Sequence, residues 1–271
     1  MSNMQVSVIL TSYNYGQYLK DTINSVLNQT FKDWELIVVD DCSTDNSVEI
    51  ITEFANSDGR IKVIRNYENQ GLAAAVQTGL IAATGEWVAF LESDDLWRED
   101  YLQTKLEAAE KYPGAGFIYN GVEFFDKNAE SVRAKFQSII DKNRKLKFPR
   151  KMFYSFGYEN PVLTMSSVMA KRVLFEGLSF DTPIDKLLDW YLYIQLARKT
   201  DFYYIDKPLT LWRQHSDSYL NQRRRIKFRF ANISAYLTVL RQEPWNLKLL
   251  IFIILSAVLM CFKRLKIYFS A

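Results

Sequence analysis

The sequence predicts an α/β fold in which a mostly parallel sheet is flanked by helices. Short, continuously apolar runs alternate with helical patterns over the first 97 residues. Polar or acidic turns follow these runs. At 271 residues, with 48% hydrophobic and 15% aromatic residues, the chain is long enough for one large domain with extensions.

The apolar runs are predicted to form the buried strands of this sheet, at Val6–Leu10, Leu36–Val39, Ile61–Ile64 and Trp87–Leu91. The segments between them have helical patterns, such as the stripe of Leu19, Ile23, Val26 and Leu27 on one helical face. Strands with no polar alternation are typical of a parallel sheet covered on both faces. Ligands of such sheets bind at the carboxyl ends of the strands.

The second half of the chain is less regular. The expected elements are a helix at Leu102–Ala109, a strand near Gly116–Asn120, a helix at Leu187–Lys199 and a strand at Phe202–Ile205. Between them, the basic stretch Lys142–Lys151 is expected to be a mobile loop.

An acidic turn follows the fourth strand, in the run Glu92-Ser93-Asp94-Asp95. Three carboxylates so close together repel one another, and a divalent cation would neutralise them. Mg²⁺ and Mn²⁺ commonly bridge such carboxylates to substrate phosphates. The alternative is a solvated acidic loop that caps the following helix.

A second acidic turn, Asp40-Asp41, follows the second strand. An ionised carboxylate can accept hydrogen bonds from a nucleotide base or ribose, although these residues could also simply cap a helix. Tyr13, after the first strand, offers a ring on which a base could stack, or it could serve only in packing.

Three later residues are candidates for chemistry. His215 is the single histidine, and its imidazole could bind a metal or contact a diphosphate, or it could be incidental. Asp185 and Asp189 lie four residues apart, on one face of the predicted helix with Trp190 beside the second. Either could be a catalytic base, or both could be solvated surface acids.

The end of the chain suggests a membrane surface. Leu249–Phe262 is an almost unbroken apolar run, preceded by the basic cluster Arg223–Arg229 and followed by Lys263-Arg264. It is shorter than the roughly 20 residues needed to cross a bilayer, so an interfacial or re-entrant helix is expected. The alternatives are a buried helix or a contact between copies of the chain in a homo-oligomer.

The composition also indicates where in the cell the protein is expected to lie. There are only two cysteines and no secretory signal pattern, which indicates a reducing cytoplasm with peripheral attachment to the inner face of the membrane. The net charge of +3 is small for this length, and no nucleic-acid partner is expected.

Several motifs together resemble the family 2 glycosyltransferases with the GT-A fold. In chain order they are Val6–Asn14, Ser25–Phe31, Glu35–Asp45, Asn69-Gln70-Gly71, Gly85–Asp95, Leu188-Asp189-Trp190 and Trp212–His215. The resemblance spans roughly residues 5 to 218. It implies a Rossmann-like GT-A domain over 1–218, with a nucleotide-binding part at about 1–97 and an acceptor-binding part at about 98–218. Residues 219–271 are then a helical, membrane-associating tail.

The resemblance also implies roles for individual residues. By position, the nucleoside-binding residues are Thr11, Tyr13 and Asp41, with Asp40 nearby; the metal and diphosphate motif is Glu92 and Asp94; the late histidine near the diphosphate is His215; and the catalytic base is Asp189. The implied cofactor is Mg²⁺ or Mn²⁺.

Three residues depart from the family pattern. Glu92 stands where aspartate is usual, Val76 where arginine is frequent, and Leu188 where glutamate often precedes the base.

The implied reaction is transfer of a sugar from a nucleotide-diphosphate donor to a hydroxyl of a glycan or lipid-linked glycan, with inversion, in the synthesis of a bacterial surface polysaccharide. A nucleotidyltransferase or dinucleotide-dependent oxidoreductase is disfavoured, because the loop after the first strand has neither a glycine pattern nor a basic side chain. The alternative is a non-catalytic subunit that binds a sugar nucleotide or serves as a scaffold.

Overall fold

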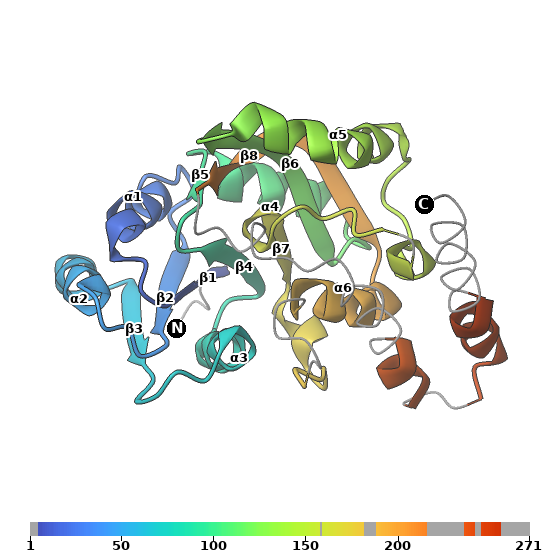
Figure 1. Cartoon of the computed structure of the whole chain (residues 1–271), viewed down its shortest axis with the longest axis horizontal. Coiled ribbons are helices and arrows are strands. Elements are labelled where there is room, and N and C mark those ends of the chain that lie inside the picture. The colour runs from blue at the N-terminus through green and yellow to red at the C-terminus, as the bar shows by residue number, and fades with distance from the viewer. Residues whose placement is uncertain (1–4, 158, 182–187, 216–235, 242–244, 256–271) are drawn as a thin grey trace, which may run out of the picture.

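The computed structural model describes residues 5–157, 159–181, 188–215, 236–241 and 245–255 (Figure 1). The nucleotide-side half alternates strands and helices as expected: β1 (Val6–Ser12), α1 (Gly16–Leu27), β2 (Trp34–Asp40), α2 (Ser47–Ser57), β3 (Ile61–Arg65), α3 (Leu72–Ala82) and β4 (Trp87–Glu92). The remaining elements are β5 (Leu96–Trp97), α4 (Tyr101–Lys111), β6 (Phe117–Asp126), α5 (Ala129–Lys145), the 3-10 turns η1 (Phe153–Gly157), η2 (Met165–Ser167) and η3 (Arg172–Phe175), β7 (Val168–Lys171), α6 (Leu188–Lys199) and β8 (Phe202–Gln214).

The described strands form one sheet in the order β3-β2-β1-β4-β7-β6-β8-β5. The first four are parallel, which confirms the expectation for this half. β7 then lies antiparallel between β4 and β6, and the two-residue β5 pairs antiparallel with β8 at the edge. Strands from before and after residue 97 belong to this one sheet, although the nucleotide-binding and acceptor-binding parts are expected to meet at that residue.

Side chains of the parallel strands alternate between two cores, one on each face of the sheet. Val8 and Leu10 of β1 pack with α1, α2 and α4, whereas Ile9 packs on the opposite face with α3 and α6. All three residues are at most 1% exposed. Because both faces are covered, the middle residues of β1, β2 and β4 are apolar, and this is why they read as continuous apolar runs.

A buried carboxylate fastens the amino ends of the parallel strands. Glu35 of β2 is 1% exposed and accepts hydrogen bonds from the Ser7 hydroxyl at 2.6 Å, the Thr84 hydroxyl at 2.6 Å and the Lys62 ammonium at 2.7 Å. Burial by itself would raise the pKa of Glu35, but these donors outweigh it and lower the pKa to about 2. Glu35 is therefore a charged cross-link between three strands and the turn that precedes β4.

The expectation of a mobile loop at Lys142–Lys151 is wrong at its start. α5 continues to Lys145, because one side of this charged helix has partners on the sheet. Phe136 stacks near Phe124 of β6 at a ring distance of 6.0 Å. Asn143 is buried, where it accepts a hydrogen bond from the Tyr119 hydroxyl at 3.0 Å.

Two short pieces of the expected tail are described, at residues 236–241 and 245–255. Helical residues 247–255 pack Leu249 and Ile253 into the core on the α6 side of the sheet. Residues 256–262, the rest of the apolar run, and the arginine cluster at 223–229 lie outside the described residues. Among the described helices, none combines the length and the apolar character needed to cross a membrane.

Candidate active site

The carboxyl ends of β1, β2 and β4 bring the predicted residues to one edge of the sheet. In the strand register, Ser12 lies beside Asp40, and Thr11 lies beside Glu92. Thr11 is half-buried, and Tyr13, just beyond the strand, is 44% exposed. The register thus places the expected nucleoside-binding residues of β1 between the two acidic turns.

Asp40 and Asp41 are both buried, and both accept hydrogen bonds from nearby backbone amides. An Asp40 oxygen accepts a hydrogen bond from the Ser43 amide at 3.0 Å and so stabilises the turn after β2. Asp41 accepts three hydrogen bonds from the segment before α3: Oδ1 from the Asn66 side chain at 2.7 Å and the Gln70 amide at 3.0 Å, and Oδ2 from the Gly71 amide at 2.8 Å.

The loop after β1 is clamped to the loop after β2. The Asn14 amide donates to the Ser43 hydroxyl at 2.9 Å, and the Gly16 amide donates to Asp45 at 2.9 Å. A Cβ atom at Gly16 would come within 2.1 Å of Oδ1 of Asn46, so a larger residue there would displace the end of that side chain. The two loops therefore form one wall of the site.

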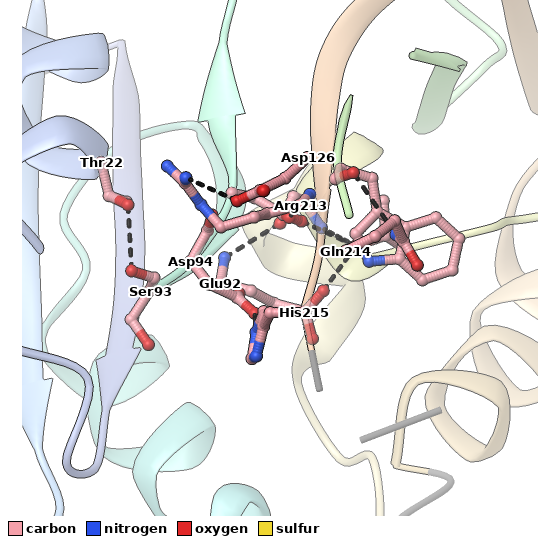
Figure 2. A network of polar contacts seen from close by, with 12 residues as sticks. Thr22, Glu92, Ser93, Asp94, Asp126, Arg213, Gln214 and His215 are labelled. Atoms are coloured by element: carbon pink, nitrogen blue, oxygen red, sulfur yellow. Dashed lines mark hydrogen bonds and ion pairs between the residues drawn. The ribbon is translucent and has the colours of Figure 1, made fainter. Parts of the chain in front are cut away.

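The acidic turn meets the single histidine. Nε2 of His215, just after β8, lies 2.9 Å from Oδ2 of Asp94. Figure 2 shows both side chains. His215 is 8% exposed, and the rings of Tyr15 and Tyr18 lie beside it at 6.0 and 5.1 Å. The structure thus joins two predicted metal-binding residues that are 121 positions apart in the chain.

Arg213 fixes the shape of the acidic turn from β8. Its Nε donates to the Asp94 carbonyl oxygen at 2.9 Å, and its amide donates to Asp95 at 3.0 Å. The guanidinium also forms an ion pair with Asp126 at 3.5 Å. Both residues are labelled in Figure 2. Arg213 belongs to the Trp212–His215 motif, but nothing in the local sequence pattern shows which turn its side chain reaches.

Glu92 turns toward η2. The Thr164 hydroxyl donates to Oε2 of Glu92 at 2.5 Å and lies 3.2 Å from Asp95, while the Ser166 hydroxyl accepts from the Glu92 amide at 2.9 Å. Burial raises the pKa of Asp95 well above its usual range, and the charges of Asp94 and Glu92 raise it further. Thr164 and Ser166 were missed from the sequence because their segment has no pattern that places it against β4.

A carboxylate oxygen and an imidazole nitrogen are both available here to a divalent cation that accepts oxygen and nitrogen ligands. Neighbouring ligands of an octahedral ion with bonds of about 2.1 Å lie roughly 3 Å apart. The 2.9 Å between Asp94 Oδ2 and His215 Nε2 matches that spacing. Within the described part of the chain, no three acidic, histidine or cysteine side chains converge on one point. Asp94 and His215 therefore suit an ion that completes its shell with phosphate oxygens and water, as Mg²⁺ commonly does.

Asp189 lies in the first turn of α6, half-buried. Its Oδ2 is 3.4 Å from the Asn160 side-chain nitrogen. Trp190 anchors the same turn by donating from Nε1 to the Phe156 carbonyl oxygen at 3.1 Å. The rival acid, Asp185, lies outside the described residues.

Asp189 and Glu92 approach the same residue from two elements. Burial raises the pKa of Tyr193 well above its usual range, and the negative charges of Asp189 and Glu92 raise it further. The expected base and the expected metal turn therefore both act electrostatically on the Tyr193 hydroxyl.

Two of the three departures from the family pattern are packing residues. Val76 of α3 and Leu188 of α6 are each 1% exposed, and both belong to the core on one face of the sheet. A charged side chain at either position would have to be accommodated in that core.

Comparison with known proteins agrees with this geometry. The sequence model of the family described as "Glycosyl transferase family 2" matches residues 7–177. The chain is 33% identical over 198 residues to the Escherichia coli protein "UDP-Glc:alpha-D-GlcNAc-diphosphoundecaprenol beta-1,3-glucosyltransferase WfgD", covering 73% of this chain and 72% of that protein. It is 36% identical over 167 residues to the Bacillus subtilis "Putative teichuronic acid biosynthesis glycosyltransferase TuaG", covering 62% of each.

Solved structures share the fold. Staphylococcus aureus TarS 1–349 in complex with UDP-GlcNAc matches with a TM-score of 0.66 and 19% identity, over 88% of this chain and 67% of that one. The mannosyltransferase PcManGT from Pyrobaculum calidifontis, in complex with GDP-Man and Mn²⁺, matches with a TM-score of 0.63 and 20% identity, over 88% and 64%. The predicted GT-A fold is thereby confirmed, and with the family match it shows that this chain belongs to the family 2 glycosyltransferases.

Proposed function

We propose that the protein transfers a sugar from a nucleotide-diphosphate donor to a hydroxyl acceptor, with inversion and with Mg²⁺ or Mn²⁺ as cofactor. The observation on which this chiefly rests is the Asp94–His215 pair at the strand ends, together with Asp189, a separate carboxylate in the first turn of α6. The pair supplies an anchor for the diphosphate, and the helix supplies a separate carboxylate for the acceptor.

The nucleoside lies, in this proposal, at the ends of β1 and β2. The exposed ring of Tyr13 offers a surface on which the base stacks. Oδ2 of Asp41 accepts a hydrogen bond from the Gly71 amide, and a carboxylate oxygen can accept a second one from the base or ribose. Thr11, beside Glu92 in the register, lies between the nucleoside and the diphosphate. Asp40 supports this site indirectly, because its bond to the Ser43 amide shapes the turn that carries Asp41.

Asp94 and His215 would hold the cation, with Glu92 beside them. When bound, the cation neutralises charge on the diphosphate leaving group. Arg213 keeps the Asp94 carbonyl and the Asp95 side chain in place, so the ligands need little rearrangement when the donor binds. The TarS and PcManGT complexes contain UDP-GlcNAc and GDP-Man respectively, and a nucleotide sugar of this class is the proposed donor here.

Asp189 is the proposed general base. Its carboxylate accepts the proton of the acceptor hydroxyl while that oxygen attacks the anomeric carbon. The bond from the anomeric carbon to the diphosphate oxygen breaks, and the nucleoside diphosphate leaves with the electron pair. Attack from the face opposite the leaving group inverts the anomeric centre, as in glycosidases that use a single displacement.

The proposed acceptor is a glycan or lipid-linked glycan of a bacterial surface polymer. The names of the two bacterial relatives refer to teichuronic acid biosynthesis and to a diphosphoundecaprenol-linked sugar. The chain spans 62% of the B. subtilis relative, so the similarity does not cover that whole protein.

A membrane surface is the proposed location of the reaction, on the cytoplasmic side. Residues 247–255 pack one side on the domain and leave another side apolar and exposed, through Leu247, Leu250, Ile251, Ile254 and Leu255. Trp245, just before this helix, is 94% exposed. Aromatic and aliphatic side chains next to basic residues such as Lys248 are typical of a helix that lies in the interface of an anionic bilayer. A contact between copies of the chain is the competing explanation for this surface.

The test is donor hydrolysis by the full chain, measured without acceptor over a panel of UDP- and GDP-sugars, with Mn²⁺, with Mg²⁺ and with a chelator. We expect one donor to be hydrolysed, and only with the metal. Full turnover in chelator would refute metal dependence. Tight donor binding with neither hydrolysis nor transfer, even to lipid-linked acceptors, would favour the non-catalytic subunit.

A further inference from the structure

Tyr193 of α6 has a buried hydroxyl that finds no hydrogen-bond partner among the residues that the structure describes. The side chain is 1% exposed, so water does not solvate the group from outside. Leaving a buried donor unpaired costs folding free energy, and native proteins pair nearly all such groups. A phenylalanine would fill the same space without this cost, which indicates that the hydroxyl has a use in another state of the protein.

The ring is held rigidly. Phe117 of β6 contacts it edge-on at a ring distance of 5.2 Å, and Phe156 of η1 lies at 6.2 Å. Rotation of a phenol ring about its own axis does not move the hydroxyl oxygen, so this packing fixes where the oxygen lies. The hydroxyl is therefore a donor whose position is fixed before any ligand binds.

Two carboxylates lie around this donor. Asp189 precedes Tyr193 by one helical turn, and residues spaced by four share a face of a helix. Glu92 approaches from the end of β4, where the Thr164 hydroxyl holds one of its oxygens at 2.5 Å. Burial chiefly, and the charges of Asp189 and Glu92 in addition, raise the pKa of Tyr193, so Tyr193 remains a donor throughout the range in which a glycosyltransferase works.

We propose that Tyr193 is a positioning residue for Asp189: its hydroxyl donates a hydrogen bond to the Asp189 carboxylate once the acceptor is bound. The inference rests on the proposed role of Asp189 as the base. One oxygen of Asp189 then accepts from Tyr193, while the other takes the proton of the acceptor hydroxyl. The Tyr193 proton stays on Tyr193 throughout.

The bond has two effects. It orients the carboxylate toward the acceptor, and it stabilises the charged form of a half-buried aspartate against protonation. Without it, we expect the acid limb of the pH–rate profile to move to higher pH, because Asp189 would bind a proton more readily. The shift in the pH profile distinguishes positioning of the base from a role in packing alone.

The test is Tyr193→Phe in the full chain. We expect kcat to fall about tenfold, as for loss of one hydrogen bond to a charged group, and the acid limb of the profile to move upward. KM for the donor nucleotide should stay the same, and the thermal unfolding midpoint should stay equal or rise, because an unpaired buried donor is removed. Lower stability with an unchanged pH profile would overturn the proposal.

Tyr119 provides a matched control on the neighbouring strand. Its hydroxyl is also buried, but it donates to Asn143 at 3.0 Å. Tyr119→Phe leaves that amide without its donor, so we expect a lower unfolding midpoint and an unchanged pH profile. The two substitutions remove the same atom with opposite expected results.

A double-mutant cycle separates this inference from the proposed function. In an Asp189→Asn background, Tyr193→Phe should cause no further loss of rate, because the group that it serves has been removed. If Asp189→Asn transfers sugar at the parent rate, the assignment of the base is wrong. If Asp189→Asn is inactive and Tyr193→Phe retains both the parent rate and the parent pH profile, the assignment of Asp189 as the base is upheld and the role of Tyr193 is refuted.

Discussion

The Thr164 hydroxyl donates a hydrogen bond to Glu92 at 2.5 Å, and this contact ties η2 to the end of β4. The extra methylene of glutamate, relative to the aspartate usual in the family, gives the side chain the reach to make it. The same hydroxyl lies 3.2 Å from Asp95, so Thr164 links two carboxylates of the acidic turn.

Thr164→Val should therefore weaken the metal site. It keeps the shape of threonine but leaves Glu92 without this donor, and outer-shell contacts of this kind are typically worth about 10- to 100-fold in metal affinity or activity. We expect the Mn²⁺ concentration for half-maximal donor hydrolysis to rise by a factor of that order. Thr164→Ser, which retains the hydroxyl, is the control. Equal Mn²⁺ requirements in all three proteins would contradict the prediction.

His215→Ala should remove one of the two proposed metal ligands. We expect a loss of about 100- to 1,000-fold in kcat, comparable with loss of one strong electrostatic contact to a developing charge. The measurement is donor hydrolysis at saturating nucleotide sugar over a Mn²⁺ titration. Asp126→Asn is the control, because Asp126 contacts Arg213 on the side away from the histidine and should cost little. A His215→Ala protein with the parent metal titration would show that the histidine is not a ligand.

Asp189→Asn should abolish transfer and spare donor binding. Loss of a general base typically costs about 100- to 10,000-fold. Because Asp41 and Asp94 are unchanged, the Kd for the nucleotide sugar, measured by calorimetry, should stay within error of the parent. The comparison is Asp185→Asn, which we expect to remain active. If the two results are reversed, the base lies one helical turn earlier; if both variants are active, it lies on another element.

Glutamates on the exposed side of the C-terminal helix should release the protein from membranes. Ile251→Glu combined with Ile254→Glu replaces two exposed apolar side chains with charges. Since burying one such side chain contributes about 1.5–3 kcal/mol, we expect binding to vesicles containing phosphatidylglycerol, measured by co-sedimentation, to fall at least about tenfold. Ile81→Glu on α3, which is 80% exposed, is the control and should bind like the parent. A parent chain that sediments with no vesicles but forms a stable dimer would favour the contact between copies.

Acid should destabilise the protein partly through Glu35. Its pKa is about 2 in the folded protein and 4.5 in the ordinary state, so its contribution is fully present above pH 4.5 and is lost as the pH falls toward 2. That difference corresponds to stabilisation on the order of 3 kcal/mol. The free energy of unfolding, measured with denaturant from pH 6 down to pH 2, should decline less for Glu35→Gln than for the parent. Glu123→Gln removes an exposed ion pair with Arg98, and its free energy of unfolding should decline with pH as the parent's does. If Glu35→Gln declined as steeply as Glu123→Gln, the prediction would be refuted.

The fold was predictable where side-chain burial is uniform along an element. β1, β2 and β4 are apolar on both faces, and each ends in a recognisable polar turn, so their order and their shared edge followed from the sequence. β7 was not predicted as an antiparallel strand between β4 and β6, because its four residues carry no signal of direction or neighbours. α5 was missed because its buried side depends on β6 rather than on a local apolar stripe.

The candidate site could be predicted to about the same extent as the fold. Residues at strand ends, such as Thr11 and Glu92, meet because the register of a parallel sheet requires it. The contacts that orient them could not be inferred, since Arg213 reaches the acidic turn from a distant strand and Thr164 reaches it from a 3-10 turn. Such contacts depend on the packed arrangement of η2, β8 and β4, which no spacing along the chain encodes.

The antiparallel insertion of β7 also has a consequence for biosynthesis. Until residues 168–171 leave the ribosome, β4 has a partner on one side only, and its other edge exposes unpaired backbone groups. The first half of the domain therefore cannot close its sheet during translation, and it must wait for contacts between residues far apart in the chain, which form slowly. A nascent chain stalled between β4 and β7 is the species in which aggregation and chaperone capture should concentrate.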